Sequence, residues 1–478
     1  MKQIAALSFF VLIAFSSCKK DVLLTDSAAK LNFSTDSVLF DTVFTTVGST
    51  TKTFKIHNLH SQPLNISKVY LATGSNSQFR MNVDGVSGTL LNDIQIPGGD
   101  SLFVFVQVTV NPTHANAPLL IRDSIIFETN GNTQHVMLTA IGQDVYLHKP
   151  DHFPINGLPP FSIIQCNSTW LNDKPHLIFG YAVVDEGCTL RMQAGTHVYL
   201  NNKAVLWVYH GGTLIVDGLH GSEVTFQGAR LEADYKDVPG QWGKIWLSSG
   251  SINNVINWAV IKNGSIGVQA DTLGASSNPT LRISNTIIKN MSAAAIYGQG
   301  SFIRGNNCVF ANCGQYAAAL TIGGKYSFLQ CTFADYWTGK PRTTPLLNLN
   351  NYYVDINGVT QVRNLDSAYF GNCILYGDLT DEVGLDTFAI AGVFNYKFDY
   401  CLLKTALNTG SSLHFNSVIA NQDPMFADQS INNYQLTAGS VNAIDKGNPV
   451  IFIGTDLNNK PRPNPNTSYP DLGAYEFY

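Results

Sequence analysis

A short phrase of strand-forming residues returns six times between Ala259 and Cys401, and it constrains the fold more than any other feature of the sequence. Each copy begins with a small residue that two strand formers follow, and the six starts are Ala259, Thr286, Cys308, Cys331, Cys373 and Cys401. Successive starts lie 27, 22, 23, 42 and 28 residues apart. Repeats of this length, rich in strand and turn residues and without helical periodicity, predict a solenoid of β-coils.

The same alignment explains the cysteines. Stacked coils place equivalent positions above one another at about 4.8 Å, the spacing of parallel strands. The six starts therefore form an inward column of Cys, Thr and Ala, in which a buried thiol packs as a small apolar group. A second column, four positions later, holds turn formers: Asn263, Asn290, Asn312, Asp335 and Gly377. Zinc binding is the alternative, but it needs closer cysteine spacing than this column offers.

This pattern resembles the right-handed parallel β-helix of the pectate-lyase-like superfamily, and we assign residues 161–421 to such a domain. Trp242, within Gly240–Ile245, matches a coil phrase of secreted bacterial β-helices, where it either covers the edge of the helix or stacks on a sugar. Cys166 and Cys188 lie one coil length apart, so they form either a disulfide or two inward-facing thiols. The scaffold hosts lyases, hydrolases, adhesins and binding proteins, so the resemblance implies an architecture and not an activity.

Residues 1–18 are typical of a targeting segment, because Lys2 precedes an apolar run that is too short to span a bilayer. The ending Ser16-Ser17-Cys18 resembles the lipobox of bacterial lipoproteins, which implies that Cys18 is lipidated and becomes the mature N-terminus. An ordinary signal peptide with a chance cysteine is the alternative. The resemblance predicts a lipid anchor in the outer membrane, on its periplasmic or its surface face, with residues 19–30 as a tether.

Residues 31–147 show the period-2 alternation of β-strands, clearest at Leu102–Val110, with turns between the strands. This pattern predicts a β-sandwich. The order of Phe40–Val43, Phe54–Asn58 and Pro63–Ile66 resembles the immunoglobulin-like domains of the Hydin and DUF1573 type, which are mostly spacers or protein-binding modules. The proline-rich residues 148–160 are expected to form a stiff linker.

The spacing of 42 residues between Cys331 and Cys373 indicates either a cryptic coil or an excursion over residues 336–366. Binding residues are often placed on long excursions from a rigid scaffold. The aromatic and basic side chains of this segment suit an acidic glycan, although a solvated loop is the alternative. The candidate glycan-binding residues are Trp337, Lys340, Arg342, Tyr352 and Tyr353.

The next connection gathers four carboxylates within nine residues: Asp378, Asp381, Glu382 and Asp386. Oxygen ligands at this density can hold Ca²⁺, and they are the candidate metal ligands. Their spacing matches no known calcium loop and favours a charged turn. No other cofactor is expected.

Residues 422–478 resemble the C-terminal segment of bacterial β-helix proteins known as the choice-of-anchor Q type, on phrases such as Asn442–Gly447 and Asp471–Glu476. Such a segment is expected to cap the solenoid and so to cover its apolar core. Arg462 is expected to hold the cap by bonding one or two of its carboxylates, which are Asp445, Asp456, Asp471 and Glu476.

The sequence thus predicts an all-β chain: an N-terminal immunoglobulin-like β-sandwich, then a right-handed parallel β-helix with a C-terminal cap. Only 13% of the residues are charged, the net charge is −5, and there is no basic run, so nucleic acid is not an expected partner. Paired aspartates, Gly-x-Ser-x-Gly, His-Glu-x-x-His and P-loop motifs do not occur.

Two functions follow from these observations. The first, which we favour, is a non-catalytic, monomeric envelope lipoprotein whose β-helix binds a polysaccharide or a surface protein. The second is a polysaccharide lyase or glycoside hydrolase, with Lys340 or Arg342 acting beside Asp378 or Asp381.

Overall fold

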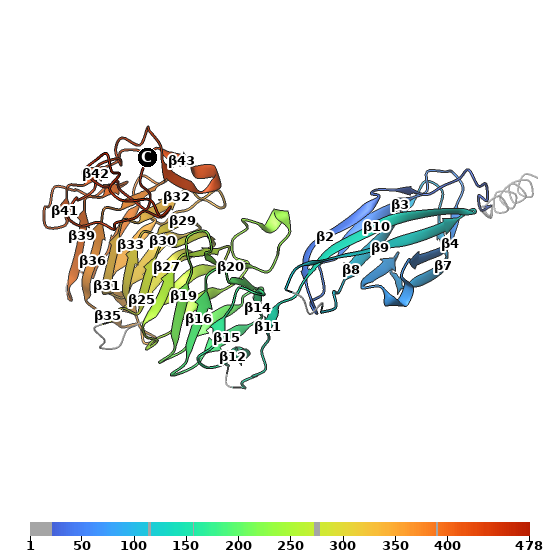
Figure 1. Cartoon of the computed structure of the whole chain (residues 1–478), viewed down its shortest axis with the longest axis horizontal. Coiled ribbons are helices and arrows are strands. Elements are labelled where there is room, and N and C mark those ends of the chain that lie inside the picture. Colours follow the sequence, from blue (N-terminus) through green and yellow to red (C-terminus); the bar gives the residue numbers. More distant parts are fainter. Residues whose placement is uncertain (1–21, 113–115, 156, 272–277, 389–390) are drawn as a thin grey trace, which may run out of the picture. The chain divides into compact units, whose positions relative to one another are not determined.

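The computed structural model describes the chain except for residues 1–21, 113–115, 156, 272–277 and 389–390. The chain forms two compact units, Met1–Val145 and Tyr146–Tyr478 (Figure 1). The described residues contain no α-helix, which confirms the all-β prediction; their 3-10 turns are Gly74–Asn76 (η1), Ala233–Tyr235 (η2) and Gln429–Ile431 (η3). In this part of the chain, no helix is long and apolar enough to cross a membrane.

Two five-stranded sheets form the first unit, as expected for a β-sandwich. One sheet contains, in spatial order, Asn32–Phe33 (β1), Lys52–His57 (β3), Ser101–Val108 (β8), Phe79–Val83 (β5) and Val86–Gly88 (β6). The other contains Ser37–Phe44 (β2), Asn132–Gln143 (β10), Leu119–Thr129 (β9), Leu64–Leu71 (β4) and Leu90–Ile96 (β7). The alternation predicted for Leu102–Val110 is present, because Val104, Val106 and Val108 are fully buried in the core between the sheets.

Three parallel sheets form the second unit, and a full coil contributes one strand to each (Figure 1). The eleven-stranded sheet contains Tyr146–His148 (β11), His176–Ile178 (β14), His197–Leu200 (β17), Val224–Gly228 (β20), Ala259–Lys262 (β23), Ile287–Met291 (β26), Val309–Cys313 (β29), Thr332–Asp335 (β32), Ile374–Gly377 (β37), Leu402–Leu403 (β40) and Ile419–Ala420 (β42).

The nine-stranded sheet contains Phe161–Ile163 (β12), Tyr181–Val184 (β15), Val205–Val208 (β18), Lys244–Leu247 (β21), Ile266–Ala270 (β24), Ala294–Gln299 (β27), Tyr316–Thr321 (β30), Leu347–Asn350 (β33) and Val383–Asp386 (β38). The ten-stranded sheet contains Thr169–Trp170 (β13), Thr189–Gln193 (β16), Thr213–Asp217 (β19), Asn254–Asn257 (β22), Leu281–Ser284 (β25), Phe302–Asn306 (β28), Gly324–Leu329 (β31), Leu365–Gly371 (β36), Phe394–Asp399 (β39) and Phe415–Asn416 (β41). Two antiparallel hairpins join Tyr352–Val354 (β34) to Thr360–Val362 (β35), and Phe426–Asp428 (β43) to Asn433–Leu436 (β44).

The predicted cysteine column is present in the eleven-stranded sheet. Val309 pairs with Thr332, which pairs with Ile374. The cysteines that directly precede these residues therefore stack above one another. The free thiols of this column, Cys308, Cys331, Cys373 and Cys401, are all buried in the apolar core. The turn column is present as well, because Asn312 Nδ2 donates to Asn290 Oδ1 at 2.7 Å and both residues have a positive φ.

A further turn column, which the sequence alignment did not identify, lies directly before the cysteines. Its members all have a positive φ: Trp258, Asn285, Asn307, Gln330, Asn372 and Tyr400. Asn suits this conformation, but tryptophan and tyrosine adopt it only under constraint from their surroundings. The register of the stacked strands therefore determines this turn more strongly than the identity of the residue does.

Residues 149–160 connect two strands of the β-helix and do not lie between the two units. β11 already pairs with β14, and β12 pairs with β15. The expected linker is thus part of the first coil. Cys166 and Cys188, for which the sequence left two possibilities, form a disulfide with a Cα–Cα distance of 4.9 Å.

The C-terminal segment, residues 422–478, covers the β-helix, but mainly along its side. Phe426, Tyr434 and Leu472 belong to an apolar cluster with Val309 and Ile374, which point outward from the eleven-stranded sheet. Asn432 Nδ2 also donates to Asn290 Oδ1 at 3.2 Å, several coils away from the end of the solenoid. The segment therefore covers the outer face of this sheet between Ile287 and Ile419.

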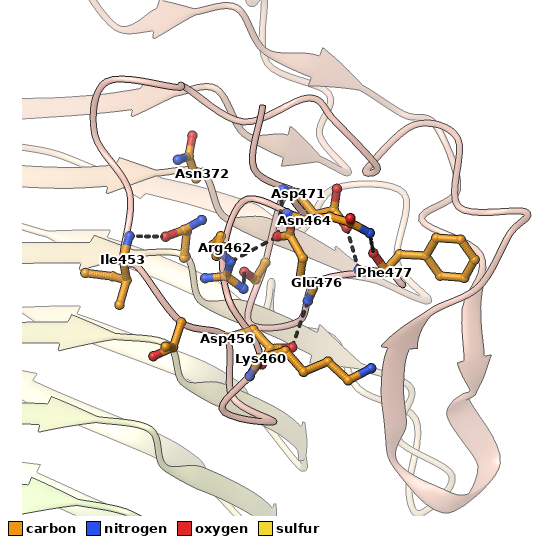
Figure 2. A network of polar contacts seen from close by, with 12 residues as sticks. Asn372, Ile453, Asp456, Lys460, Arg462, Asn464, Asp471, Glu476 and Phe477 are labelled. Atoms are coloured by element: carbon orange, nitrogen blue, oxygen red, sulfur yellow. Dashed lines mark hydrogen bonds and ion pairs between the residues drawn. The ribbon is translucent and has the colours of Figure 1, made fainter. Parts of the chain in front are cut away.

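Arg462 holds this segment in place, as Figure 2 shows. Its Nε donates to Glu476 Oε2 at 3.2 Å, and its Nη1 donates to Asn307 Oδ1 of the β-helix at 2.7 Å. Asp456 and Asp471 accept backbone N–H groups of the same segment. The prediction that Arg462 bonds a carboxylate is confirmed, and this group of charged residues is part of the structural support.

Candidate functional site

The predicted glycan-binding segment contains a coil. β33 pairs in register with β30 on one side and with β38 on the other, so it is an ordinary member of the nine-stranded sheet. β36 then continues the ten-stranded sheet. The hairpin β34–β35 is inserted between these two strands. Of the two possibilities for residues 336–366, the structure therefore shows the coil, with a hairpin added.

Arg342 lies inside the protein. Its Nη1 and Nη2 donate to the two carboxylate oxygens of Glu382 at 2.7 and 2.5 Å, and its Nε lies 3.7 Å from Asp335 Oδ2. The Arg342 side chain is 3% exposed and both carboxylates are fully buried. This placement corrects the expectation that Arg342 faces a ligand, because its guanidinium bonds groups of the coil itself.

The four other predicted residues are not gathered at one place. Trp337 and Lys340 precede β33, whereas Tyr352 and Tyr353 follow it, so the two pairs lie at opposite ends of this strand. Trp337 lies so close to Gly339 that a Cβ there would come within 2.7 Å of the indole ring. Tyr352 donates its hydroxyl to Asp386 at 2.9 Å. A single binding wall made of these residues is therefore not formed.

The four carboxylates proposed for calcium are likewise separated. Glu382 pairs with Arg342, Asp386 accepts from Tyr352, and Asp381 accepts from Thr405 Oγ1 at 3.1 Å. Asp378 is exposed. Among the described residues, no group of three or more His, Cys, Asp or Glu side chains is arranged to hold a metal ion.

Asp335 shows the electrostatic cost of burying two carboxylates beside Arg342. Burial raises the pKa of its carboxyl to about 8, against the opposing attraction of Arg342, and the neighbouring Glu382 raises it further. Burial is the main cause, and Arg342 offsets it only in part, because Glu382 makes both of the short bonds to the guanidinium that the two carboxylates share. Arg342, Asp335 and Glu382 are buried and paired with one another, so they are not open to a substrate.

Trp242 is not available to a sugar either. It is fully buried, and its Nε1 donates to the backbone oxygen of Lys262 at 2.9 Å. Of the two roles considered for it, the structural one is therefore the role that this residue has.

The outer face of the nine-stranded sheet carries a row of aromatic and amide side chains, which we call the Trp row. Successive strand pairings join its members across the coils: Trp207, Trp246, Gln269 and Tyr297. The rings of Trp207 and Trp246 stack with centroids 4.9 Å apart at an interplanar angle of 11°. Their neighbours along the strands point into the core, so these side chains are on the outside.

Polar contacts fix the middle of the Trp row. Trp246 Nε1 and Gln269 Nε2 donate to the two oxygens of Asp271 at 2.6 and 2.7 Å. Lys244 Nζ donates to Gln269 Oε1 at 2.6 Å and lies 4.7 Å from the centre of the Trp246 ring. Burial lowers the pKa of Lys244, and the charge of Asp271 opposes that shift. These contacts hold Trp246 and Gln269 in place, and Lys244 and Asp271 put opposite charges beside the row.

Two tyrosines extend this surface at the Trp207 end. Tyr181 and Tyr209 each meet the Trp207 ring nearly at right angles, with centroids 6.1 and 5.4 Å away. Tyr209 is 41% exposed. The repeats of the sequence did not predict this surface, although tryptophan is the third residue of both β18 and β21, in Val-Leu-Trp-Val and Lys-Ile-Trp-Leu.

Comparison with known proteins supports the β-helix. A family described as "Right handed beta helix region" matches residues 177–333, from β14 to β32. No curated protein matches the chain.

Solved structures give only weak likenesses. A PapD-like domain of human CEP192 shares 10% identity over 27% of this chain and 92% of its own, with a TM-score of 0.18. The catalytic unit of a GH87 α-1,3-glucanase from Streptomyces thermodiastaticus shares 9% identity over 77% and 88%, with a TM-score of 0.23. A GH87 α-1,3-glucanase catalytic domain in complex with nigerose shares 10% identity over 77% and 87%, with a TM-score of 0.22. These scores carry no argument, so what stands is that residues 177–333 are similar to right-handed β-helix proteins.

Proposed function

We propose that this chain is a non-catalytic protein of the cell envelope whose β-helix binds a glycan along the Trp row. The anchor in this proposal is lipid on Cys18, which lies outside the described residues and rests on the lipobox-like sequence. The N-terminal sandwich then serves as a spacer between the membrane and the binding domain.

The observation that carries the proposal is the composition of the outer face of the nine-stranded sheet. Tyrosine and tryptophan combine an apolar ring with a polar tip, which suits a ligand with apolar ring faces and hydroxyl edges. Beyond Gln269, whose own amide already bonds Lys244 and Asp271, the amide of Asn348 follows the same pairing across the sheet. Amide groups both donate and accept hydrogen bonds, as hydroxyl groups require.

The shape of the surface favours a polymer. A β-sheet face is nearly flat, so a single sugar would bury little of its surface there. A chain that lies across successive strands, about 4.8 Å apart, can instead make repeated small contacts. The expected ligand of the Trp row is therefore an extended polysaccharide, and the proximity of Lys244 to Asp271 favours a neutral one.

A glycan array tests this proposal when it is probed with the purified wild type and, in parallel, with the variant Tyr181→Ala/Tyr209→Ala. Both tyrosines lie on the outside of the sheet, so the variant is expected to fold and to lose about tenfold in affinity, or about 1.4 kcal/mol. Tyr469→Ala removes an exposed ring from the C-terminal segment and should bind like the wild type.

The same samples are assayed for products by reducing ends and by absorbance at about 235 nm, the wavelength for unsaturated uronates. No turnover is expected. Product formation would overturn the non-catalytic proposal in favour of a lyase or hydrolase. Equal affinities of the tyrosine variant and the wild type for the bound glycan would show that the glycan does not contact the Trp207 end of the Trp row, and would overturn the proposed surface.

A further inference from the structure

We propose a second binding surface, on the outer face of the ten-stranded sheet, which takes an anionic polysaccharide and holds one of its carboxylates beside Lys397. This inference goes beyond the proposed function and does not rest on it. The surface belongs to a different sheet, and its ligand has a different charge from the one expected at the Trp row.

Cations collect on this face although the chain as a whole has a net charge of −5. Strand pairing places Arg282 directly beside Arg304, and the same line continues through Ser327 and Tyr369 to Lys397. Arg282 and Arg304 are exposed. Of the ion pairs between described residues, none involves these arginines or Lys397. Their charges therefore remain available to a ligand.

Phe302 holds two of the cations in position. The guanidinium carbon of Arg304 lies 5.1 Å from the centre of this ring, and Lys325 Nζ lies 5.0 Å from it. The ring itself is 4% exposed. A cation held over an aromatic face loses less freedom when it binds an anion than a freely moving side chain does. The basic line is thus partly organised before a ligand arrives.

A small pocket lies at the Lys397 end of this line. Its volume is about 300 Å³, and its lining includes Ser367, Tyr369, Asn395, Tyr396, Lys397 and His414. None of these is acidic. The carboxylate on the same strand, Asp399, is buried and accepts from Tyr369 at 2.9 Å and from Asn416 at 2.6 Å. Lys397 therefore supplies the cationic group of the pocket lining.

The other lining groups suit a hydroxylated ring. The His414 ring stacks on Tyr396 with centroids 4.1 Å apart, and the contact of its Nδ1 with the Tyr396 carbonyl oxygen at 3.0 Å fixes its orientation. Ser367 and Asn395 place a hydroxyl and an amide at the same pocket. A volume of this size accepts about one sugar ring. The combination favours a carboxylate-bearing sugar over a simple ion or a lipid headgroup.

The test measures binding of polygalacturonate, with dextran as the neutral probe and single-stranded DNA as an unrelated polyanion. Arg282→Gln/Arg304→Gln and Lys397→Gln are each expected to lower the affinity for polygalacturonate about tenfold at low salt. The affinity of the wild type is expected to fall as salt is raised, because exposed charges are screened. Lys340→Gln/Lys446→Gln removes the same charge from exposed positions elsewhere and should have little effect.

Three results would overturn the inference: no binding of polygalacturonate, equal losses in the matched control variant, or DNA bound as tightly as polygalacturonate. Binding measured with Tyr181→Ala/Tyr209→Ala separates this proposal from the proposed function of the Trp row. If the Trp row fails to bind glycan while Lys397→Gln still weakens polygalacturonate binding, only the proposed function is lost. Melting temperatures of all variants show whether a loss of binding reflects unfolding.

Discussion

Arg462 reaches from the C-terminal segment to Asn307 of the β-helix, where its Nη1 donates to Oδ1 at 2.7 Å. The arginine side chain is fully buried, as is that of Glu476, with which it pairs. One side chain thus joins two parts of the chain that are far apart in sequence, and the stability of the C-terminal segment should depend on it.

Arg462→Met is expected to destabilise the protein by about 3–5 kcal/mol, because it leaves Glu476 buried without its partner. Denaturant unfolding followed by tryptophan fluorescence measures the change. Arg462→Met/Glu476→Met should recover much of the loss, since the uncompensated charge is then gone. Lys446→Met is the matched control at an exposed position, and a similar loss in that variant would contradict the role given to Arg462.

Stability should fall as pH rises across the range in which Asp335 loses its proton. Burial raises the pKa of this carboxyl from 3.8 to about 8, so the folded protein holds the proton over a range in which the unfolded chain has released it. This contribution to stability is complete below pH 3.8 and is lost as pH rises through about 8.

Asp335→Asn keeps an oxygen that can accept from the Cys313 N–H and removes the titration. Its free energy of unfolding should depend less on pH between these limits than that of the wild type. Asp471, whose pKa burial raises to about 7, contributes with the same sign, so part of the slope should remain. A variant with the full slope of the wild type would show that Asp335 is not the group responsible.

The cysteine column should tolerate small residues and reject charge. Cys331→Ala or Cys331→Ser is expected to be mild, because equivalent positions already hold Ala and Thr. Cys331→Asp buries a carboxyl without a partner and should cost at least about 2 kcal/mol. In unfolded, unreduced Cys18→Ser protein, thiol titration should count the five free cysteines, which are Cys308, Cys313, Cys331, Cys373 and Cys401. A lower count would mean that column thiols are paired.

The hairpin β34–β35 should be dispensable, whereas the coil around it is not. Replacing residues 354–360 with a two-residue Asn-Gly turn is expected to change the melting temperature little, because the shorter loop alters closure entropy only slightly. Leu347→Asp places a charge in the core of the same coil and should unfold the β-helix. Loss of the fold in the hairpin variant would show that the hairpin stabilises the coil.

Lipidation of Cys18 is tested by detergent-phase partition. Protein expressed with its N-terminal segment should enter the detergent phase, and Cys18→Ser should stay in the aqueous phase, because a thioether-linked lipid is the proposed anchor. Cys313→Ala, which removes a thiol of the β-helix, should partition like the wild type. Unchanged partition of Cys18→Ser would refute the anchor.

The sequence predicted those features that arise from a position repeated in successive coils. The cysteine column and the Asn290–Asn312 contact follow from alignment of the coils, because stacking turns sequence period into spatial contact. The ion pair of Arg342 with Glu382 was not predictable in this way, since each occurs once, in a different connection. The Trp row was missed because Trp207 and Trp246 occupy outward positions, where the β-helix does not require any particular side chain.

The position of the C-terminal segment could not be predicted from the sequence either. Its phrases indicated that it covers apolar surface, but both the end of the solenoid and the side of the eleven-stranded sheet offer such surface. Only the three-dimensional arrangement shows that Val309, Ala311 and Ile374 form the face to which Phe426 and Leu472 bind.

The C-terminal segment has a consequence for the order in which the molecule matures. Coils of a solenoid contact only their neighbours, so a β-helix alone can form or unravel piecewise. This segment bonds coils at Asn290, Asn307 and Asn372 at once, and it follows all of them in the chain. Before this segment has bound, the apolar face around Val309 and Ile374 is exposed to other chains. Once it has bound, the coils that it contacts unfold together rather than one by one.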